Sequence, residues 1–149
     1  MTSLTVVRAD ASHIPLLVPL FDAYRRFYVQ ESDEAGARAF LSERLERGES
    51  VIFLALDGST PVGFTQLYPS FTSVGIRRLW ILNDLFVAPE GRRRGVGQAL
   101  LERARRHGEE TGAARLTLTT ALDNLAAQSL YEAQGWRRDE TFYTYDLPL

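Results

Sequence analysis

The amino-acid sequence predicts a single α/β domain, and three observations support that prediction. The chain has 149 residues, which is the usual size of one domain. Hydrophobic residues make up 45% and charged residues 24% of it, and these values are typical of a folded globular protein rather than a disordered or coiled-coil chain. Short β-branched runs alternate with segments in which apolar residues recur every three or four positions, so both strands and helices are expected. We therefore expect one domain over residues 1–149.

The first third of the chain predicts one strand followed by two helices. Residues 4–8 (LTVVR) form a β-branched run, and Asp10 can cap a helix that follows it. Between Ile14 and Tyr28, apolar and aromatic residues lie on one stripe at helical spacing. A second helix is expected from Ala35 to Glu46, because Gly48 can end it.

The middle of the chain predicts the main strands of a sheet. Ser50 to Asp57 (SVIFLALD) and Pro61 to Tyr68 (PVGFTQLY) are separated by Gly58-Ser59-Thr60, which is typical of a hairpin turn. Leu79 to Val87 (LWILNDLFV) is mostly apolar. Such a run favours a central strand that is covered on both faces.

The last third predicts a helix, a strand, a helix and a closing strand. The expected bounds are Gly91–His107 for an amphipathic helix, Leu116–Thr120 for a strand, Asn124–Gln134 for a short helix and Phe142–Leu147 for the last strand. This order of elements is typical of a layered α/β fold.

Composition and charge exclude several classes of protein. A net charge of −2 gives no general attraction to nucleic acid or to an anionic membrane surface. The absence of cysteine excludes disulfides and thiolate metal sites, and His13 and His107 are expected to be solvated or at helix ends, so no metal site is predicted. No export signal or run of ~18 apolar residues is present. We expect a cytoplasmic protein that binds neither nucleic acid nor membrane.

The most informative stretch is residues 82–101 (LNDLFVAPEGRRRGVGQALL), which reads as a strand, a glycine-rich turn and an amphipathic helix. Main-chain N–H groups of such a turn and of a helix N-terminus converge where an anion can bind, and the helix dipole favours negative charge there. Gly95 and Gly97 let a phosphate approach the main chain closely. The arginines before them add positive charge, so the segment predicts an anion-binding site.

This stretch does not match two other phosphate-binding motifs. A dinucleotide-binding fingerprint would need glycine where Leu100 stands, and a Walker A loop would need a Gly-Lys-Ser/Thr sequence that is missing. An RNA-binding basic helix is disfavoured by the net acidity and by the lack of aromatic residues beside the arginines. The remaining alternative is a solvated helix start with an ordinary glycine turn.

Two motifs resemble those of one known family. Arg92-x-x-Gly95-x-Gly97, after the strand that ends at Val87, resembles the acyl-CoA signature of the GNAT superfamily of N-acetyltransferases. Residues 124–136 (NLAAQSLYEAQGW) resemble that superfamily's N-x-x-A-x-x-x-Y-x-x-x-G-F/W block. The resemblance extends over essentially the whole chain. The opening segments resemble in particular the histone and polyamine acetyltransferase-like members. It implies the GNAT fold, a central mixed and mostly antiparallel sheet flanked by helices.

The resemblance also implies a site for acetyl-CoA as cofactor. The main chain of Leu85, Phe86 and Val87 would pair with the pantetheine amides as a neighbouring strand would. Asn124, with Gln128 and Ser129 nearby, would bind the pantetheine arm. The residues that would hold the pyrophosphate are Arg92, Arg93, Arg94, Gly95, Val96, Gly97 and Gln98.

Acetyl transfer by direct nucleophilic attack needs a neutral amine. Since a primary amine has a pKa near ~10.4, removing its proton at pH 7 costs about 4.6 kcal/mol. Polyamine acetyltransferases of this family often carry a glutamate at the position of Asn83, so Asp84 could take the proton, or Asn83 could hold a water that passes it outward. A structural role for Asp84 is an equal alternative. Tyr131 matches the tyrosine that protonates the departing thiolate in many members; the alternative is a tyrosine that only packs a helix.

In this family the first two helices and their connection wall the acceptor pocket. This would place Tyr24, Tyr28, Glu31, Asp33 and Glu34 there, with Tyr68 at the end of the hairpin. Aromatic and acidic side chains suit a cationic amine, although the acidic ones could simply be solvated. The implied substrate is a small primary amine, a polyamine or an amino acid, and a homodimer is a family-level expectation. The alternatives are acetylation of protein lysine or N-terminal amines, and a non-catalytic acyl-CoA-binding sensor.

Overall fold

The computed structural model describes residues 3–149, which divide into two compact units. The first unit ends at Thr119 and contains all the strands described; the second, Thr120–Leu149, contains the helix α4 (Leu125–Ala133). Each unit is therefore described by itself. The expectation of one domain over residues 1–149 stays a prediction.

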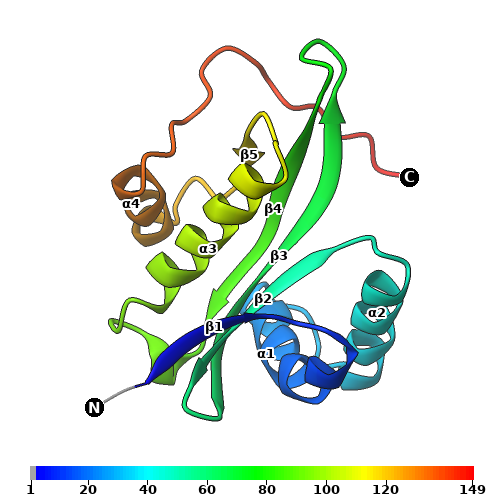
Figure 1. Ribbon diagram of the computed structural model, residues 1–149, viewed down its shortest axis with the longest axis vertical. Helices are drawn as coiled ribbons and strands as arrows, with labels where there is room; N and C mark the ends of the chain where they lie inside the picture. Colours follow the sequence, from blue (N-terminus) through cyan, green and yellow to red (C-terminus); the bar gives the residue numbers. More distant parts are fainter. Residues whose placement is uncertain (1–2) are drawn as a thin grey trace. The chain divides into compact units, whose positions relative to one another are not determined.

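The sheet of the first unit has the order β1-β2-β3-β4-β5 (Figure 1). The first four strands are antiparallel neighbours, and β5 runs parallel to β4. This confirms the mixed, mostly antiparallel sheet predicted from the sequence. The strands are β1 (Leu4–Arg8), β2 (Val51–Asp57), β3 (Thr60–Thr72), β4 (Arg77–Val87) and β5 (Leu116–Thr117).

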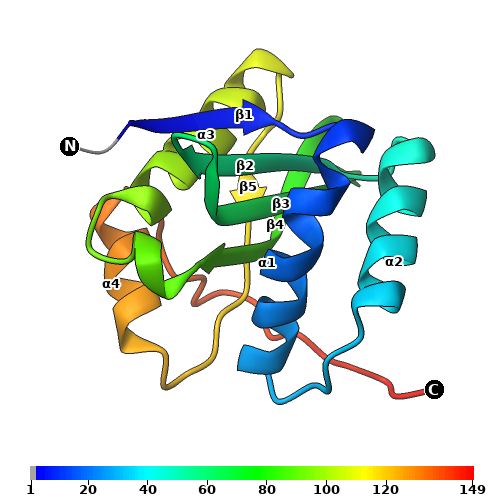
Figure 2. The same cartoon turned by 90° about the horizontal axis from the view of Figure 1, so that it is seen from below.

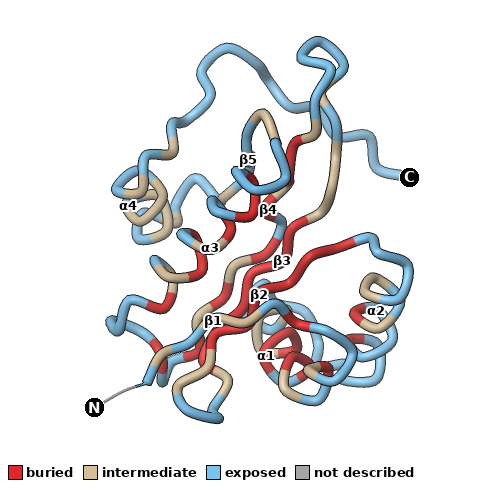
Figure 3. The backbone as a smooth tube through the Cα atoms, viewed as in Figure 1, coloured by how far each residue is buried: buried red, intermediate tan, exposed pale blue. Residues whose placement is uncertain are grey.

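Helices cover both faces of this sheet (Figure 2). The helices α1 (Ile14–Phe27) and α2 (Glu34–Glu46) lie on one face, and α3 (Val96–Glu110) lies on the other. Because β2 is covered on both sides, every residue from Val51 to Ala55 is buried (Figure 3). The core on the α1 side includes Ile52 and Leu54.

The start of α1 follows its sequence signals. Asp10 accepts a hydrogen bond from the amide of Ser12 at 2.9 Å and so caps the short 3-10 turn η1 (Ala11–His13) that leads into the helix. His13 lies in that turn and its Nδ1 accepts from the amide of Asp10 at 3.0 Å. The expectation that His13 lies at a helix end is therefore confirmed. No helix among residues 3–149 is long and apolar enough to cross a membrane.

One expected strand is absent, and the expected helix Gly91–His107 instead runs from Val96 to Glu110. Residues 142–147 form no strand, because aromatic residues favour a strand only where a neighbouring strand can pair and pack with them; the side chains of Phe142 and Tyr145 are 80% and 90% exposed. His107 lies in the last turn of α3, which confirms its expected place at a helix end, but it is buried, and its ring centroid lies 4.6 Å from that of Trp80.

Candidate functional site

One edge of β4 has a strand partner along only part of its length. Among the described residues of the first unit, β5 pairs with β4 only at residues 80–81. The amide of Ala88 donates to a carbonyl of β3 at 2.9 Å, and the main-chain groups of successive strand residues point to alternate sides. Those of Phe86 therefore face β3, whereas those of Leu85 and Val87 face the open edge. The amides of both residues and the oxygen of Leu85 are thus available to an extended ligand, whereas the oxygen of Val87 accepts from Arg92 Nε at 3.4 Å.

The segment after β4 presents a row of main-chain N–H groups. A 3-10 turn, η2 (Pro89–Gly91), ends before it, and α3 begins at Val96. Within residues 3–149, no amide of residues 93–98 has hydrogen-bond geometry to a protein acceptor; the amide of Ala99 is the next along the chain and donates to the oxygen of Gly95 at 3.0 Å. A helix start leaves its first N–H groups without partners, which makes it a binding site for anions.

Gly95 allows these amides to be reached. Its φ is +76°, and a Cβ built there would meet no atom within 4 Å. The left-handed backbone turns the chain into α3, and the absence of a side chain leaves the space beside the amides open. An anion can therefore approach these amides closely.

The three arginines of this segment make different contacts. Arg94 pairs with Asp57 at the end of β2, and this hydrogen bond lowers the pKa of the Asp57 carboxyl. Arg92 donates through Nε to a main-chain oxygen of β4 at 3.4 Å. Arg93 is exposed, has a φ of +61°, and has no recorded side-chain partner in the described chain. Arg94 therefore braces the loop, whereas Arg92 and Arg93 are exposed and form no salt bridge among the described residues, so their charges are available to a ligand.

A β-bulge in β4 separates two neighbouring polar residues. In the register with β3, Gln66 pairs with Asp84 and Leu67 pairs with Leu82, so Asn83 is the extra residue of the bulge. Bulges re-aim the side chains around them. Asn83 is exposed, whereas Asp84 is only 5% exposed.

The buried carboxyl of Asp84 is surrounded by hydrogen-bond donors. Gln66 Nε2 donates to its Oδ2 at 2.7 Å, Asn83 Nδ2 donates to its Oδ1 at 3.1 Å, and the hydroxyl of Tyr24 also donates to it. Burial raises the pKa of Asp84 because it disfavours the charged form, and the three hydrogen bonds act in the opposite direction. Such a carboxylate is suited to accept a proton.

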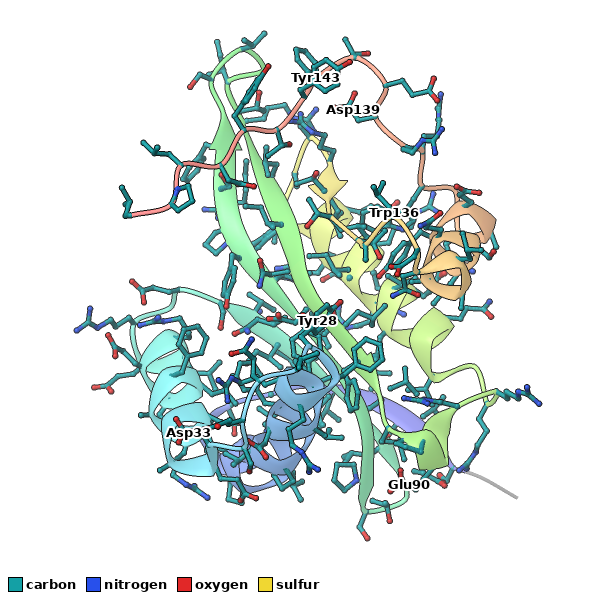
Figure 4. The ribbon with its side chains drawn as sticks, turned by 180° about the vertical axis from the view of Figure 1, so that it is seen from behind. Tyr28, Asp33, Glu90, Trp136, Asp139 and Tyr143 are labelled. Carbon is teal, nitrogen blue, oxygen red and sulfur yellow. The ribbon has the colours of Figure 1, made fainter. Side chains whose placement is uncertain are left out.

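The ring of Tyr24 is fixed by aromatic neighbours. Its centroid lies 5.7 Å from that of Phe64, 6.0 Å from that of Phe86 and 5.2 Å from that of Tyr28. Tyr28 itself is 48% exposed at the end of α1 and is labelled in Figure 4. The last turns of α1 therefore form an aromatic wall that runs from Asp84 towards solvent.

The negative charge of Asp84 affects the pKa of Tyr68. Burial, and then the negative charge of Asp84, raise the pKa of Tyr68 to about 12, while Arg44 of α2 acts in the opposite direction. The structure thus brings the sequence-predicted residues Tyr24, Tyr68 and Asp84 together. The predicted substrate residue Glu31 is exposed, and its main-chain oxygen accepts from Arg25 Nη1 at 3.0 Å.

In the acidic stretch around Glu31, one residue has a structural use. Asp33, labelled in Figure 4, accepts from the amide of Gly36 at 2.8 Å and caps α2. Its charge therefore stabilises the start of a helix, where the dipole favours an acidic side chain.

The predicted residues of the second unit make local contacts. Asn124 caps α4 by accepting from an amide in its first turn at 3.2 Å, and Gln128 donates to two loop carbonyls at 2.9 and 3.1 Å. Ser129 is exposed. The ring of Tyr131 lies 6.0 Å from that of Trp136, whose indole is also labelled in Figure 4. Roles of these residues toward a ligand stay predictions.

Sequence reasoning missed Gln66 and Arg44. The signal for Gln66 was present, because it is a polar residue inside an apolar strand, and such a residue is buried only with a partner. Arg44 gave no signal, since arginines on a helix are usually solvated. Among the residues described, no group of three histidine or acidic side chains could hold a metal ion.

Comparisons with known proteins agree with this geometry. Residues 17–136 match the Acetyltransferase (GNAT) family. The chain is 46% identical to the uncharacterized N-acetyltransferase YhfO of Bacillus subtilis (strain 168) over 144 residues, 97% of both chains.

Solved structures give the same result. A crystal structure of a probable acetyltransferase has a TM-score of 0.93 with 46% identity and covers 97% of both chains. An aminoglycoside N-acetyltransferase solved in complex with CoA shares the fold, with a TM-score of 0.83, 18% identity and coverage of 100% of this chain and 97% of that one. The GNAT fold predicted from the two sequence motifs is thereby confirmed, and this chain is an acetyltransferase that belongs to the GNAT family.

Proposed function

We propose that this protein transfers an acetyl group from acetyl-CoA to the primary amine of a small molecule. The observation that carries the proposal is the run of residues from β4 into the loop after it. The strand holds the buried carboxylate of Asp84, its open edge offers Leu85 and Val87, and the unpartnered amides of residues 93–98 follow. The CoA complex of the aminoglycoside enzyme, which has the same fold, supports this cofactor.

The residues present fit acetyl-CoA, which when bound supplies the activated acetyl thioester. The amides of residues 93–98 and the charge of Arg93 suit a diphosphate. The main-chain groups of Leu85 and Val87 suit the peptide-like amides of pantetheine, which they would bind as an added strand. Leu85 and Val87 would thus orient the ligand along β4.

The proton of the amine would go to Asp84. Burial has raised the pKa of this carboxyl towards the range in which it can accept a proton and release it again. The transfer would be direct or through a water held by exposed Asn83. Tyr131 would donate a proton to the thiolate as its charge develops.

The surroundings of Asp84 favour a small cationic acceptor. Tyr24, Tyr28 and Tyr68 offer aromatic faces that attract a cation, and the carboxylate of Asp84 adds opposite charge. Polyamines and amino acids carry such groups. A cytoplasmic location and a homodimer stay predictions.

A panel of primary amines tests the proposed reaction. With acetyl-CoA present, small diamines and amino acids are expected to release free thiol in proportion to acetylated product, measured by a colorimetric thiol assay with product identified by mass spectrometry. Turnover of peptides alone would instead support the alternative of protein acetylation. Binding of acetyl-CoA with no turnover of any amine would favour the sensor alternative.

The role of Tyr131 is tested by Tyr131→Phe, which removes only the hydroxyl. We expect kcat to fall by about 10²-fold or more, because general acid catalysis contributes that order, while the Kd for acetyl-CoA stays the same. Steady-state kinetics and calorimetric titration measure the two quantities. Equal losses in both would contradict an acid role.

The role of Asp84 is tested by Asp84→Asn. Because folding raises the pKa of Asp84 above its unfolded value near ~3.9, the stabilisation from its bound proton is fully present below that value and is lost as pH rises through the folded pKa. The free energy of unfolding of the wild type should therefore fall relative to Asp84→Asn as pH rises from about 4, and the variant should lose about 10²–10⁴-fold in turnover at pH 7.

Urea denaturation at a series of pH values measures this difference. Asp123→Asn makes the same chemical change at an exposed position and is the matched control. A difference between wild type and Asp84→Asn that does not vary with pH would contradict a buried, titrating Asp84.

A further inference from the structure

We propose that Gln66 is a positioning residue for Asp84 that holds the carboxyl in both of its protonation states by presenting either end of its amide. The proposal rests on the proposed function, because it assigns Gln66 to the proton transfer attributed to Asp84. It adds a residue that neither sequence motif contains.

The geometry places Gln66 directly opposite Asp84. The two residues are partners in the register of β3 and β4, and Gln66 Nε2 lies 2.7 Å from Asp84 Oδ2. Gln66 is 0% exposed. The other end of its amide, Oε1, is buried without a hydrogen-bond donor among the described residues. One half of the amide is therefore engaged with the carboxylate and the other half is unused.

An unused buried acceptor destabilises a protein. Its hydration is lost on folding and no protein donor replaces it, whereas an apolar side chain of similar shape at the same place carries no such loss. A role in packing alone therefore does not explain a glutamine here. Polar groups of this kind are typical of functional sites.

The chemistry of an amide explains the unused end. An ionised carboxylate only accepts hydrogen bonds, whereas a protonated carboxyl also has an O–H to donate. The Nε2 end of Gln66 matches the ionised form, and the Oε1 end, after a half-turn of the terminal amide, matches the protonated form. When the ammonium group of a substrate loses its proton to Asp84, the negative charge of the carboxylate is neutralised, and Oε1 can then accept from the new O–H. Loss of that proton to solvent restores the first arrangement.

The other groups that face Asp84 do not replace Gln66 as the buried partner of the carboxyl in both protonation states. Asn83 of β4 is exposed at the bulge, so water can replace it. Tyr24 of α1 donates to the carboxylate and can rotate its hydroxyl. Tyr68 of β3 stays neutral, since its pKa is raised to about 12 by burial and by the charge of Asp84, while the positive charge of Arg44 of α2 acts in the opposite direction.

Gln66→Met tests the proposal, because methionine keeps the length of the side chain and removes both ends of the amide. In the protein without substrate or cofactor, the pKa of Asp84 is expected to rise by about one pH unit or more, since the ionised form loses its fully buried donor. Carbon-13 NMR of labelled aspartate carboxyls measures this pKa, and the signal of Asp84 is identified by its absence in Asp84→Asn. The unfolding temperature is expected to stay the same or rise.

Thr65→Val is the matched control on the same strand. Thr65 is also 0% exposed, and its hydroxyl donates at 2.8 Å to the main-chain oxygen of Asp84 rather than to its carboxyl. We expect this variant to lower the unfolding temperature and to leave the pKa of Asp84 unchanged. The same pattern in Gln66→Met, a lower unfolding temperature with an unchanged pKa, would mean that Gln66 is merely structural and would overturn the proposal.

The half-turn of the Gln66 side-chain amide can be followed by NMR. The side-chain N–H signals of Gln66 are expected to shift during the titration with the same midpoint as the Asp84 carboxyl; signals that do not respond would overturn the proposal. In the active enzyme, the acid limb of kcat/KM in Gln66→Met is expected to move to higher pH with an unchanged KM for acetyl-CoA. Full turnover by Asp84→Asn would instead overturn the proposed role of Asp84, and with it the role of Gln66.

Discussion

The main-chain N–H and C=O groups of a protein need hydrogen-bond partners, and one part of the described structure leaves most of them without one. The outer edge of β4 loses its strand partner after residue 81, and the amides of residues 93–98 have no acceptor among the described residues. Elsewhere the sheet is paired on both sides of β2, β3 and the first part of β4. A bound ligand that carries both amides and a diphosphate would satisfy these groups, and this supports the proposal that the cofactor binds where regular strand pairing stops.

The same strand also determines where proton transfer can take place. The bulge at Asn83 exposes one polar residue and buries the next, so that Asp84 lies under the aromatic wall of α1 beside Gln66. Burial makes the carboxyl a better proton acceptor, and the donors around it limit how far its pKa rises. The proposed cofactor surface and the proposed proton acceptor thus lie on neighbouring segments of one strand, and a shift of the register is expected to disturb both.

Local signals in the sequence were sufficient for most elements. Periodicity and caps predicted α1 and α2 to within a residue or two, and the glycine-rich turn predicted the segment with unpartnered amides. Contacts between distant segments had no such signal. The bulge that buries Asp84, the partner Gln66 and the pairing of Arg94 with Asp57 all depend on the register of strands that are far apart in the sequence. The aromatic residues of 142–147 predicted a strand wrongly, because a local sequence carries no information about a pairing partner.

The central claim is that the main chain from β4 into α3 is the cofactor surface, and amide NMR tests it most directly. Nitrogen-15 correlation spectra are recorded as CoA or pantetheine is added. The account predicts that the amides of Leu85 and Val87 shift with both ligands, whereas those of residues 93–98 shift only with CoA, which alone carries the diphosphate. If saturating CoA left the amides of residues 93–98 unchanged, the account would be contradicted.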